Sequence, residues 1–207
     1  MKLFWSSRSP FVRKVMMVAH ETATVDRIER IRTLVAPTKP NPEVMASNPL
    51  NKLPTLLLDD GRALYDSRVI AEYLDTLHTG PRLFPSDPAA RIEALRLQAL
   101  ADGVLDFLLV GLSERARPAD QQSPDLQAAL AVKFTAAFDQ LEREAAAAAM
   151  TGTTPTIGQI TIAAVCGYAD FRYAAEDWRK GRPQLAAWHA RFALRPSYRA
   201  TEHQDVY

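Results

Sequence analysis

The sequence predicts an α+β protein made of a mixed N-terminal domain and an all-helical C-terminal domain. Short apolar segments that are typical of strands occur near the N-terminus, between residues 3 and 65. Alanine, the strongest helix former, occurs 6 times in residues 1–79 and 27 times in residues 80–207. Residues 80–88 contain three prolines and one glycine, which interrupt helices. We therefore assign residues 1–79 to the first domain, 80–88 to a linker and 89–207 to the second domain.

The first domain is expected to alternate strands and helices in a defined order. An apolar strand at residues 3–5 precedes a helix whose apolar positions recur at helical spacing over residues 12–19. β-Branched residues predict a second strand within residues 24–33. Residues 55–65 read as an antiparallel hairpin around an Asp-Gly turn, and a helix over residues 70–77 follows. The resulting order, βαβ and then ββα, is that of a thioredoxin-like domain.

Helical spacing of apolar residues continues through the second domain. Two apolar stripes, at residues 97–108 and 126–141, predict two long helices that each need a partner face. A third helix begins with a capping-box pattern at Thr156–Gln159. Pro183 begins a last helix, which ends before Pro196 because proline disfavours helix in the residue that precedes it.

Composition excludes several classes of function. The 25 Lys and Arg nearly balance the 24 Asp and Glu, so no excess of charge predicts binding to nucleic acid or to a membrane surface. The single cysteine, Cys166, excludes an intrachain disulfide and a CxxC pair, and it is expected to be a small core residue. The N-terminal apolar stretch is shorter than a signal peptide requires, so we expect a cytoplasmic protein. The four histidines are scattered and no GxSxG sequence occurs, so we assign neither a metal site nor a hydrolase site.

Three polar segments lie where a strand or loop meets the next element. In the first segment, Ser9 is placed to cap the following helix and Pro10 to occupy its first turn. In the second, Asn48–Leu56, Pro54 directly precedes a strand, where an edge position or a cis peptide bond accommodates it. The third, Asp66–Ser67, lies where the hairpin ends and a helix begins, at an end that attracts anions. Taken singly, each segment is explained by capping or by loop structure.

In this order and at this spacing, the three segments resemble those of the glutathione transferase family, and the resemblance covers essentially the whole chain. Further segments of the helical half resemble bacterial members of the family: Asp170–Arg172, Asp177–Pro183, Leu185–Trp188 and Arg195–Ser197. The resemblance implies a thioredoxin-like domain that holds glutathione, followed by an all-helical glutathione transferase C-terminal domain that supplies most of the pocket for an electrophile. It also implies a cytosolic homodimer with glutathione as co-substrate.

The resemblance implies a role for each residue of the three segments. Ser9 corresponds to the serine at the head of the first helix that contacts the glutathione sulfur in the serine-type classes. Ser6 and Ser7 are alternative sulfur contacts, because these classes differ in which serine of the turn they use. The remaining correspondences concern binding: Leu53, before the cis-proline Pro54, pairs through its backbone with the cysteinyl part of glutathione, Asp66 and Ser67 hold its γ-glutamyl group, and Lys52 reaches its glycyl carboxylate.

Two positions depart from the family. Asn51 stands where the family often has glycine, which adopts a left-handed backbone more freely than asparagine does. Gln159 replaces an aspartate that is common in that helix cap, although glutamine still closes a capping box. Apolar residues of the first long helix are assigned to the core in preference to a substrate pocket, and two arginines lie near its end: Leu105, Phe107, Leu108, Leu109, Arg115 and Arg117.

These expectations define a reaction. The glutathione thiol must ionise, because the thiolate is the nucleophile, and it then attacks an electrophilic small molecule. The resemblance therefore implies a glutathione transferase. Two alternatives stay open: a glutathione-dependent peroxidase or disulfide reductase, which uses the same thiolate, and a non-catalytic glutathione transferase-like binding or regulatory protein.

Overall fold

The computed structural model describes residues 1–36, 38–147, 150 and 152–205. The described chain divides into two compact units, of which one contains Met1–Phe84 and Pro196–Tyr207 and the other contains Pro85–Arg195. The first division falls inside the segment that the sequence assigned to a linker. Residues 196–207, by contrast, were assigned to the helical domain and belong to the first unit instead. Their helix packs on the first helix of the chain, where the Arg13 guanidinium lies 4.1 Å from the ring centre of Tyr198.

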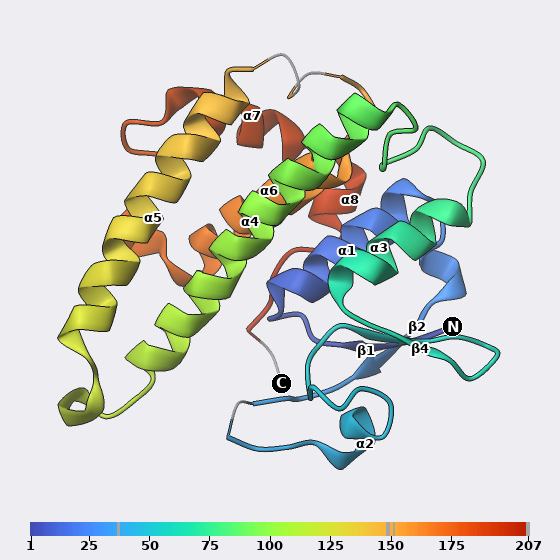
Figure 1. Ribbon diagram of the computed structural model, residues 1–207, viewed down its shortest axis with the longest axis horizontal. Helices are drawn as coiled ribbons and strands as arrows, with labels where there is room; N and C mark the ends of the chain where they lie inside the picture. The colour runs from blue at the N-terminus through green and yellow to red at the C-terminus, as the bar shows by residue number, and fades with distance from the viewer. Residues whose placement is uncertain (37, 148–149, 151, 206–207) are drawn as a thin grey trace. The chain divides into compact units, whose positions relative to one another are not determined.

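The first unit has the predicted order of strands and helices (Figure 1). Its elements are β1 (Lys2–Trp5), α1 (Pro10–Glu21), a 3-10 turn (Val25–Arg27), β2 (Glu29–Arg32), α2 (Pro42–Met45), β3 (Thr55–Leu57), β4 (Ala63–Leu64), α3 (Ser67–Thr76) and α8 (Pro196–Arg199). The expectation of an α+β, thioredoxin-like unit is confirmed. The four-residue helices α2 and α8 were not predicted, because so short a segment shows little periodicity.

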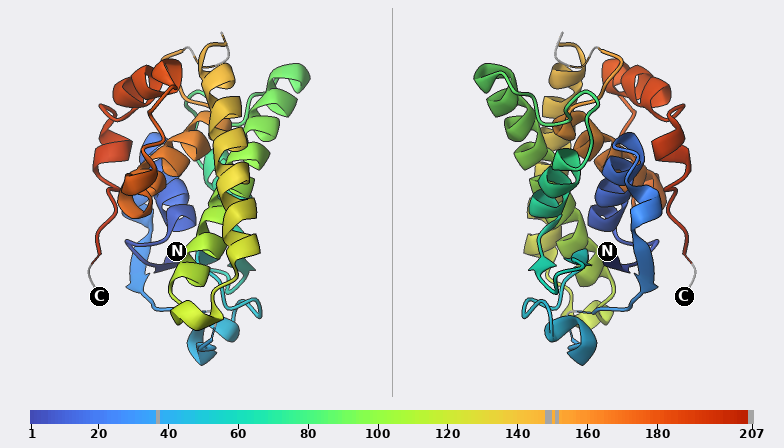
Figure 2. Two further views of the ribbon diagram at one scale, coloured as in Figure 1. Left: turned by 90° about the vertical axis from the view of Figure 1, so that its left-hand side faces the viewer. Right: turned by 90° about the vertical axis from the view of Figure 1, so that its right-hand side faces the viewer.

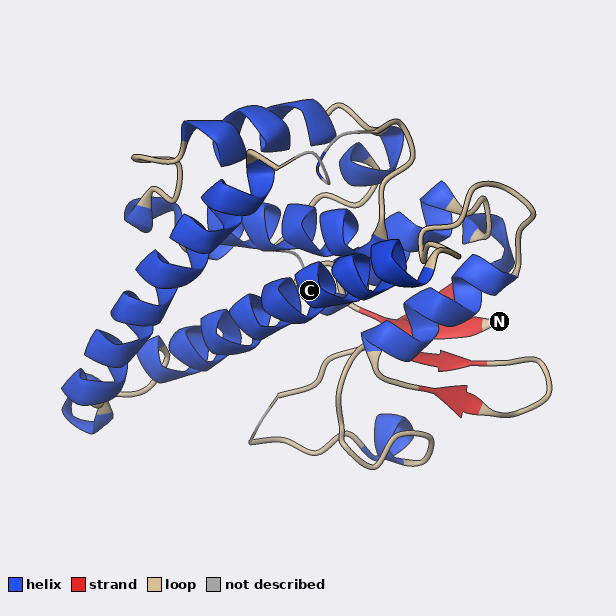
Figure 3. Cartoon of the chain, turned by 45° about the horizontal axis from the view of Figure 1, so that its top comes forward, coloured by secondary structure: helices blue, strands red, loops and turns tan. Residues whose placement is uncertain are grey.

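Within the described residues, four strands form one mixed sheet in the order β2-β1-β3-β4 (Figure 3). β2 runs parallel to β1, with Phe4 opposite Ile31. β3 runs antiparallel to β1, with Phe4 opposite Thr55, and β4 runs antiparallel to β3. The β3–β4 hairpin turns at Gly61, whose φ of 88° supplies the left-handed backbone that the Asp-Gly pair predicted.

Helices α1 and α3 cover one face of this sheet and pack on each other, whereas α2 lies on the other side (Figure 1). Leu3 of β1 and Leu56 of β3 are fully buried, as are Val15 and Met17 of α1 and Ile70 of α3. Burial of each such side chain contributes about 1.5–3 kcal/mol. The apolar spacing that predicted the two helices therefore marks their contact with the sheet and with each other.

The second unit consists of helices. Its elements are α4 (Pro88–Arg115), a 3-10 turn (Ala119–Gln121), α5 (Pro124–Ala145), α6 (Ile157–Arg172), a second 3-10 turn (Ala174–Glu176) and α7 (Pro183–Phe192). Figure 2 shows α4 and α5 side by side, and α4 makes its most extensive contact with α6. Cys166 of α6 is fully buried, which confirms it as a core residue.

Glycine 158 permits the close contact of α4 with α6. A Cβ atom at this position would lie 2.6 Å from Cβ of Leu97 and 2.7 Å from the main-chain oxygen of Ala94. Gly158 lies within the predicted capping box: the Thr156 hydroxyl accepts a hydrogen bond from the Gln159 main-chain amide, and the Gln159 side chain accepts one from the Thr156 main-chain amide. The cap fixes the start of α6, and the glycine lets α6 approach α4.

Among the described helices, none is long and apolar enough to cross a lipid bilayer.

Candidate functional site

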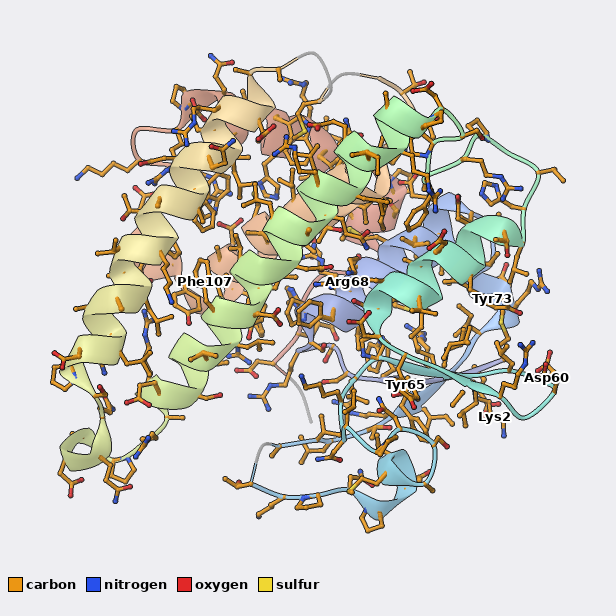
Figure 4. The ribbon with its side chains drawn as sticks, in the orientation of Figure 1. Lys2, Asp60, Tyr65, Arg68, Tyr73 and Phe107 are labelled. Atoms are coloured by element: carbon orange, nitrogen blue, oxygen red, sulfur yellow. The ribbon has the colours of Figure 1, made fainter. Side chains whose placement is uncertain are left out.

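The three polar segments of the first unit meet at one edge of its sheet. Ser6–Ser9 follow the end of β1, and because β3 is antiparallel to β1, the Leu53–Pro54 pair that precedes β3 lies at the same edge. β4 is antiparallel to β3, so Asp66, which follows β4, returns to that edge. Figure 4 shows Tyr65 and Arg68 beside the start of α3, with Lys2 and Asp60 at the opposite end of the strands. The register of the strands thus gathers the three predicted segments.

Ser9 is the N-cap of α1, as predicted. Its Oγ accepts a hydrogen bond from the Val12 amide at 3.3 Å, and Pro10 occupies the first turn, where no amide hydrogen is needed. The hydroxyl proton of Ser9 has no acceptor among the described residues. Ser9 therefore holds an unused hydrogen-bond donor at the positive end of a 12-residue helix.

The two alternative serines differ from Ser9 in their contacts. The Ser7 hydroxyl donates to the main-chain oxygen of Gln204 at 2.9 Å, so its proton is already used within the chain. The Ser6 hydroxyl oxygen accepts from the Arg8 amide at 3.3 Å and, within the described part of the chain, donates to nothing. Only Ser6 and Ser9 keep a donor for a ligand, and Ser9 alone of the two caps a helix.

The sequence analysis did not predict that the C-terminal segment contacts the loop between β1 and α1. His203 Nδ1 lies 3.0 Å from the main-chain oxygen of Ser7, and the guanidinium of Arg8 pairs with Asp205 at 3.0 Å. These contacts join residues almost two hundred positions apart, for which no local pattern in the sequence could be a signal. They tie the C-terminal segment to the loop between β1 and α1.

The segment before β3 is held by side chains buried below it. The amide nitrogen of the Asn48 side chain donates to Thr55 Oγ1 at 2.9 Å, and that hydroxyl donates to the main-chain oxygen of Lys52 at 2.9 Å. The Leu53–Pro54 peptide bond is cis, as the resemblance implied. The main-chain N–H and C=O of Leu53 have no partner among the described residues. They remain available to an extended peptide that adds along this edge.

Asn51, where the resemblance implies glycine, has a left-handed backbone. Its φ is 52°, in the left-handed region that glycine adopts most easily and asparagine tolerates. The side-chain oxygen of Asn51 accepts a hydrogen bond from the Asn41 amide at 2.9 Å. This bond stabilises the left-handed backbone of Asn51.

Asp66 and Ser67 lie at the start of α3, as predicted. Asp66 is exposed and caps the helix, with its Oδ1 accepting from the Arg68 amide at 2.9 Å. Ser67 is 2% exposed, yet its hydroxyl forms no hydrogen bond with another described residue. Lys52 is exposed and its ammonium pairs with no carboxylate within the described residues. The edge thus offers the second carboxylate oxygen of Asp66, the Ser67 hydroxyl and the Lys52 ammonium, which have no partner among the described residues.

The helical unit contains a pocket of its own, between α4, α5 and the segment that follows α6. Its volume is about 300 Å³, and Figure 4 shows Phe107 at the pocket, between α4 and α5. Aromatic side chains form much of its wall, among them Phe107, Phe134 and Tyr173. Burial raises the pKa of the Tyr173 hydroxyl. Such a lining fits an apolar or aromatic small molecule.

The residues that the sequence placed on α4 divide between core and pocket. Leu105 and Leu108 are buried, in agreement with the core assignment, but Phe107, Leu108 and Arg115 also line the pocket. Arg115 lies 4.4 Å from the ring centre of Tyr173 and pairs with Glu176. Arg117 instead pairs with Glu114 at 3.5 Å, away from the pocket. Phe107, for which the sequence analysis preferred the core to a pocket, is half-buried and lines the pocket.

No group of three or more His, Cys, Asp and Glu side chains in the described part of the chain is arranged to hold a metal ion.

Comparisons with known proteins identify the family. Residues 8–77 match the profile of the glutathione S-transferase N-terminal domain, and residues 124–191 match that of the C-terminal domain. The uncharacterized GST-like protein YibF of Escherichia coli (strain K12) is 35% identical over 202 residues, which are 98% of each chain.

Solved structures give the same result. A glutathione transferase family member from Pseudomonas fluorescens Pf-5 with bound glutathione is 39% identical, with a TM-score of 0.94 and coverage of 98% of both chains. A structure of a family member from the same organism holds S-(propanoic acid)-glutathione; it is 38% identical, with a TM-score of 0.89 over 99% of this chain and 100% of that one. The sequence profiles, the full-length relative and the matched folds agree, and the chain belongs to the glutathione S-transferase family.

Proposed function

We propose that the protein is a glutathione transferase, in which the Ser9 hydroxyl stabilises the glutathione thiolate. The observation that carries this proposal is the unused hydroxyl proton of Ser9 at the N-terminus of α1. A thiolate placed there accepts that proton in a hydrogen bond and also faces the positive end of the helix dipole. Ser7 cannot make the same bond without giving up its contact with Gln204.

The groups at the sheet edge would hold the rest of glutathione. Asp66 supplies a carboxylate for the γ-glutamyl ammonium, and the Ser67 hydroxyl and the first turn of α3 are open to the γ-glutamyl carboxylate. The main-chain groups of Leu53 pair with the cysteinyl part as an added strand would, and Lys52 attracts the glycyl carboxylate. The family member from Pseudomonas fluorescens that holds glutathione supports glutathione as the ligand.

The free energy required for thiolate formation is within reach of these groups. A cysteine-like thiol has a pKa of about 8.5, and lowering it by about two units requires about 2.7 kcal/mol. One hydrogen bond to the charged sulfur supplies about 1.5–3 kcal/mol, and the helix N-terminus adds about 0.3–1 kcal/mol. No additional base is needed, because solvent takes the thiol proton at neutral pH once the pKa lies below 7.

The thiolate then attacks an electrophilic carbon. A new S–C bond forms with the sulfur electron pair, and the leaving group departs with the pair of the bond that breaks; in an addition, the substrate takes up a proton from solvent instead. The second Pseudomonas fluorescens structure supports this type of product, since its ligand carries a propanoic acid group on the glutathione sulfur. We also propose that the protein works in the cytoplasm as a homodimer, as the family resemblance implies.

The proposal is tested with a panel of acceptors: an aryl halide, an epoxide, an α,β-unsaturated acid, an organic hydroperoxide and a mixed disulfide. Mass spectrometry identifies each product, with an enzyme-free reaction as reference. Formation of an S–C conjugate above that reference supports the transferase. Reduction of the hydroperoxide or disulfide alone would favour the peroxidase or reductase, and glutathione binding without any turnover would favour a binding protein.

A further inference from the structure

The first unit also contains a pocket, which is partly lined by the C-terminal segment. Its volume is about 110 Å³, and residues of β1, the Ser6–Ser7 turn, α1, β2 and the segment from Ala200 to Gln204 line it. Ser9, Pro54 and Asp66 are not among the lining residues. The space is several times the roughly 10–15 Å³ that one water molecule needs, so it can accept a small polyatomic ligand.

Arg13 of α1 lines this pocket and is 5% exposed. Its guanidinium stacks on the ring of Tyr198, and Nη2 donates to the main-chain oxygen of Tyr198 in a long contact of 3.4 Å. Nε is fully buried and has no hydrogen-bond acceptor, and no carboxylate pairs with Arg13 among the residues that the structure describes. Buried cations are normally paired, because removing a charge from water is costly unless an anion or several acceptors compensate it.

A second cation lines the same pocket. Arg30 of β2 is exposed, lies 5.5 Å from the ring centre of Trp5, and forms no ion pair with any described residue. The one acidic lining residue, Glu202, is exposed and pairs with neither arginine. The Ser6 hydroxyl and Thr201 add polar groups to the wall. The chain therefore places two positive charges and one exposed carboxylate around one space, and that carboxylate forms an ion pair with neither arginine.

We propose that this pocket is a binding site for a small oxyanion, with Arg13 as its buried cation and Arg30 as its entrance cation. The ligand is a carboxylate or phosphate group whose oxygens accept hydrogen bonds from the two guanidinium groups. The same residues of the turn and the C-terminal segment that line the pocket are joined by the Ser7–Gln204 hydrogen bond. A bound anion thus fastens the C-terminal segment to the turn that leads to Ser9.

Calorimetric titration of the full chain with sodium phosphate and, separately, with sodium acetate tests the proposal, with sodium chloride at equal ionic strength as reference. We expect saturable binding of at least one of the two anions, with a dissociation constant near or below about 1 mM. Arg30→Gln should weaken it about tenfold or more, and the matched control Arg27→Gln, an exposed arginine outside the pocket, should leave it unchanged. Arg13→Gln should abolish anion binding. Circular dichroism shows whether each variant is folded. If Arg13→Gln does not fold, Arg30→Gln alone decides the test.

The same titration in saturating glutathione separates this site from the proposed thiol site. Unaltered anion affinity supports a separate pocket. The proposal is overturned if neither anion binds the wild-type chain, if Arg30→Gln and Arg27→Gln bind equally well, or if glutathione displaces the anion. None of these results depends on whether the protein conjugates an electrophile.

Discussion

Ser7 and Gln204 are joined by a hydrogen bond of 2.9 Å from the Ser7 hydroxyl to the Gln204 main-chain oxygen. The main-chain amide of Gln204 in turn donates a longer hydrogen bond, of 3.4 Å, to the main-chain oxygen of Ser7. Ser9, two positions further along the same turn, has no such partner for its hydroxyl proton within the described chain. The hydroxyl proton of Ser7 is therefore used within the chain, whereas that of Ser9 is available to a ligand. Substituting each serine in turn tests this difference.

Ser9→Ala should lower kcat/KM for conjugation by about 10- to 100-fold, because a hydrogen bond to a charged sulfur contributes about 1.5–3 kcal/mol. The glutathione dissociation constant should change much less, since the hydroxyl is proposed to stabilise the thiolate rather than hold the peptide. Steady-state kinetics and calorimetry measure the two quantities. Ser7→Ala is the matched control and should keep near wild-type kcat/KM. If Ser6→Ala or Ser7→Ala lowered kcat/KM more than Ser9→Ala does, the contact with the glutathione sulfur would be assigned to that serine instead of Ser9.

Asp66→Asn separates the charge of Asp66 from its capping role. Asparagine caps helices as well as aspartate does, so the melting temperature should hardly change. Glutathione affinity should fall by about tenfold or more, because the γ-glutamyl ammonium loses its anionic partner. Asp87→Asn is the control, since Asp87 caps α4 in the same manner, through the Ala90 amide at 2.8 Å. Equal glutathione affinity in the two variants would show that Asp66 only caps α3 and does not bind glutathione.

Gly158→Ala should destabilise the protein by about 1–3 kcal/mol, because the added methyl group would overlap the backbone of α4. Gly103→Ala, on an exposed face of α4 with no atom within 4 Å of the new Cβ, should instead stabilise by roughly 0.5–1 kcal/mol. Thermal unfolding of the pair gives the comparison. Similar shifts for the two glycines would show that α6 does not need a close approach to α4.

His20 should make stability depend on pH near neutrality. Burial lowers the pKa of His20 below its ordinary value of 6.5, and the charge of Arg30 lowers it further, against the opposing effect of Asp26 and Glu21. As the pH falls through about 6.5, the unfolded chain binds a proton that the native state does not, so this stabilisation is lost with decreasing pH. His20→Gln should have a flatter plot of unfolding free energy between about pH 7 and 5.5. A slope equal to that of the wild type would show that His20 titrates normally.

Local signals in the sequence predicted much of the fold. The Asp-Gly turn at Gly61 and the capping box at Thr156–Gln159 act within a few residues, and both are found where expected. The meeting of the three polar segments at one sheet edge was not predicted; it follows from the observed strand pairing, because antiparallel neighbours return the chain to the same edge. The assignment of ligand roles to Ser9, Asp66 and the residues around Pro54 stays a prediction.

Other features depend on contacts that no local pattern encodes. The C-terminal segment contacts Ser7 and Arg8 across almost the whole length of the chain. The left-handed backbone of Asn51 is stabilised by a hydrogen bond from the main-chain amide of Asn41, which lies ten positions away in the sequence. The sequence showed the departure at Asn51 but not the bond that compensates it. Nor did helical spacing decide between core and pocket for Phe107, which lines the pocket, because spacing fixes a side chain's direction only approximately.

Ser9 is proposed to favour the ionised form of bound glutathione. Ultraviolet absorbance of the thiolate, followed against pH for the complexes of the wild type and of Ser9→Ala, measures the pKa of the bound thiol in each. We expect a wild-type pKa about two units below the roughly 8.5 of a cysteine-like thiol, and a pKa for Ser9→Ala that is higher than the wild-type value by about one to two units. A bound thiol that titrates like free glutathione, or that titrates identically in both proteins, would contradict it.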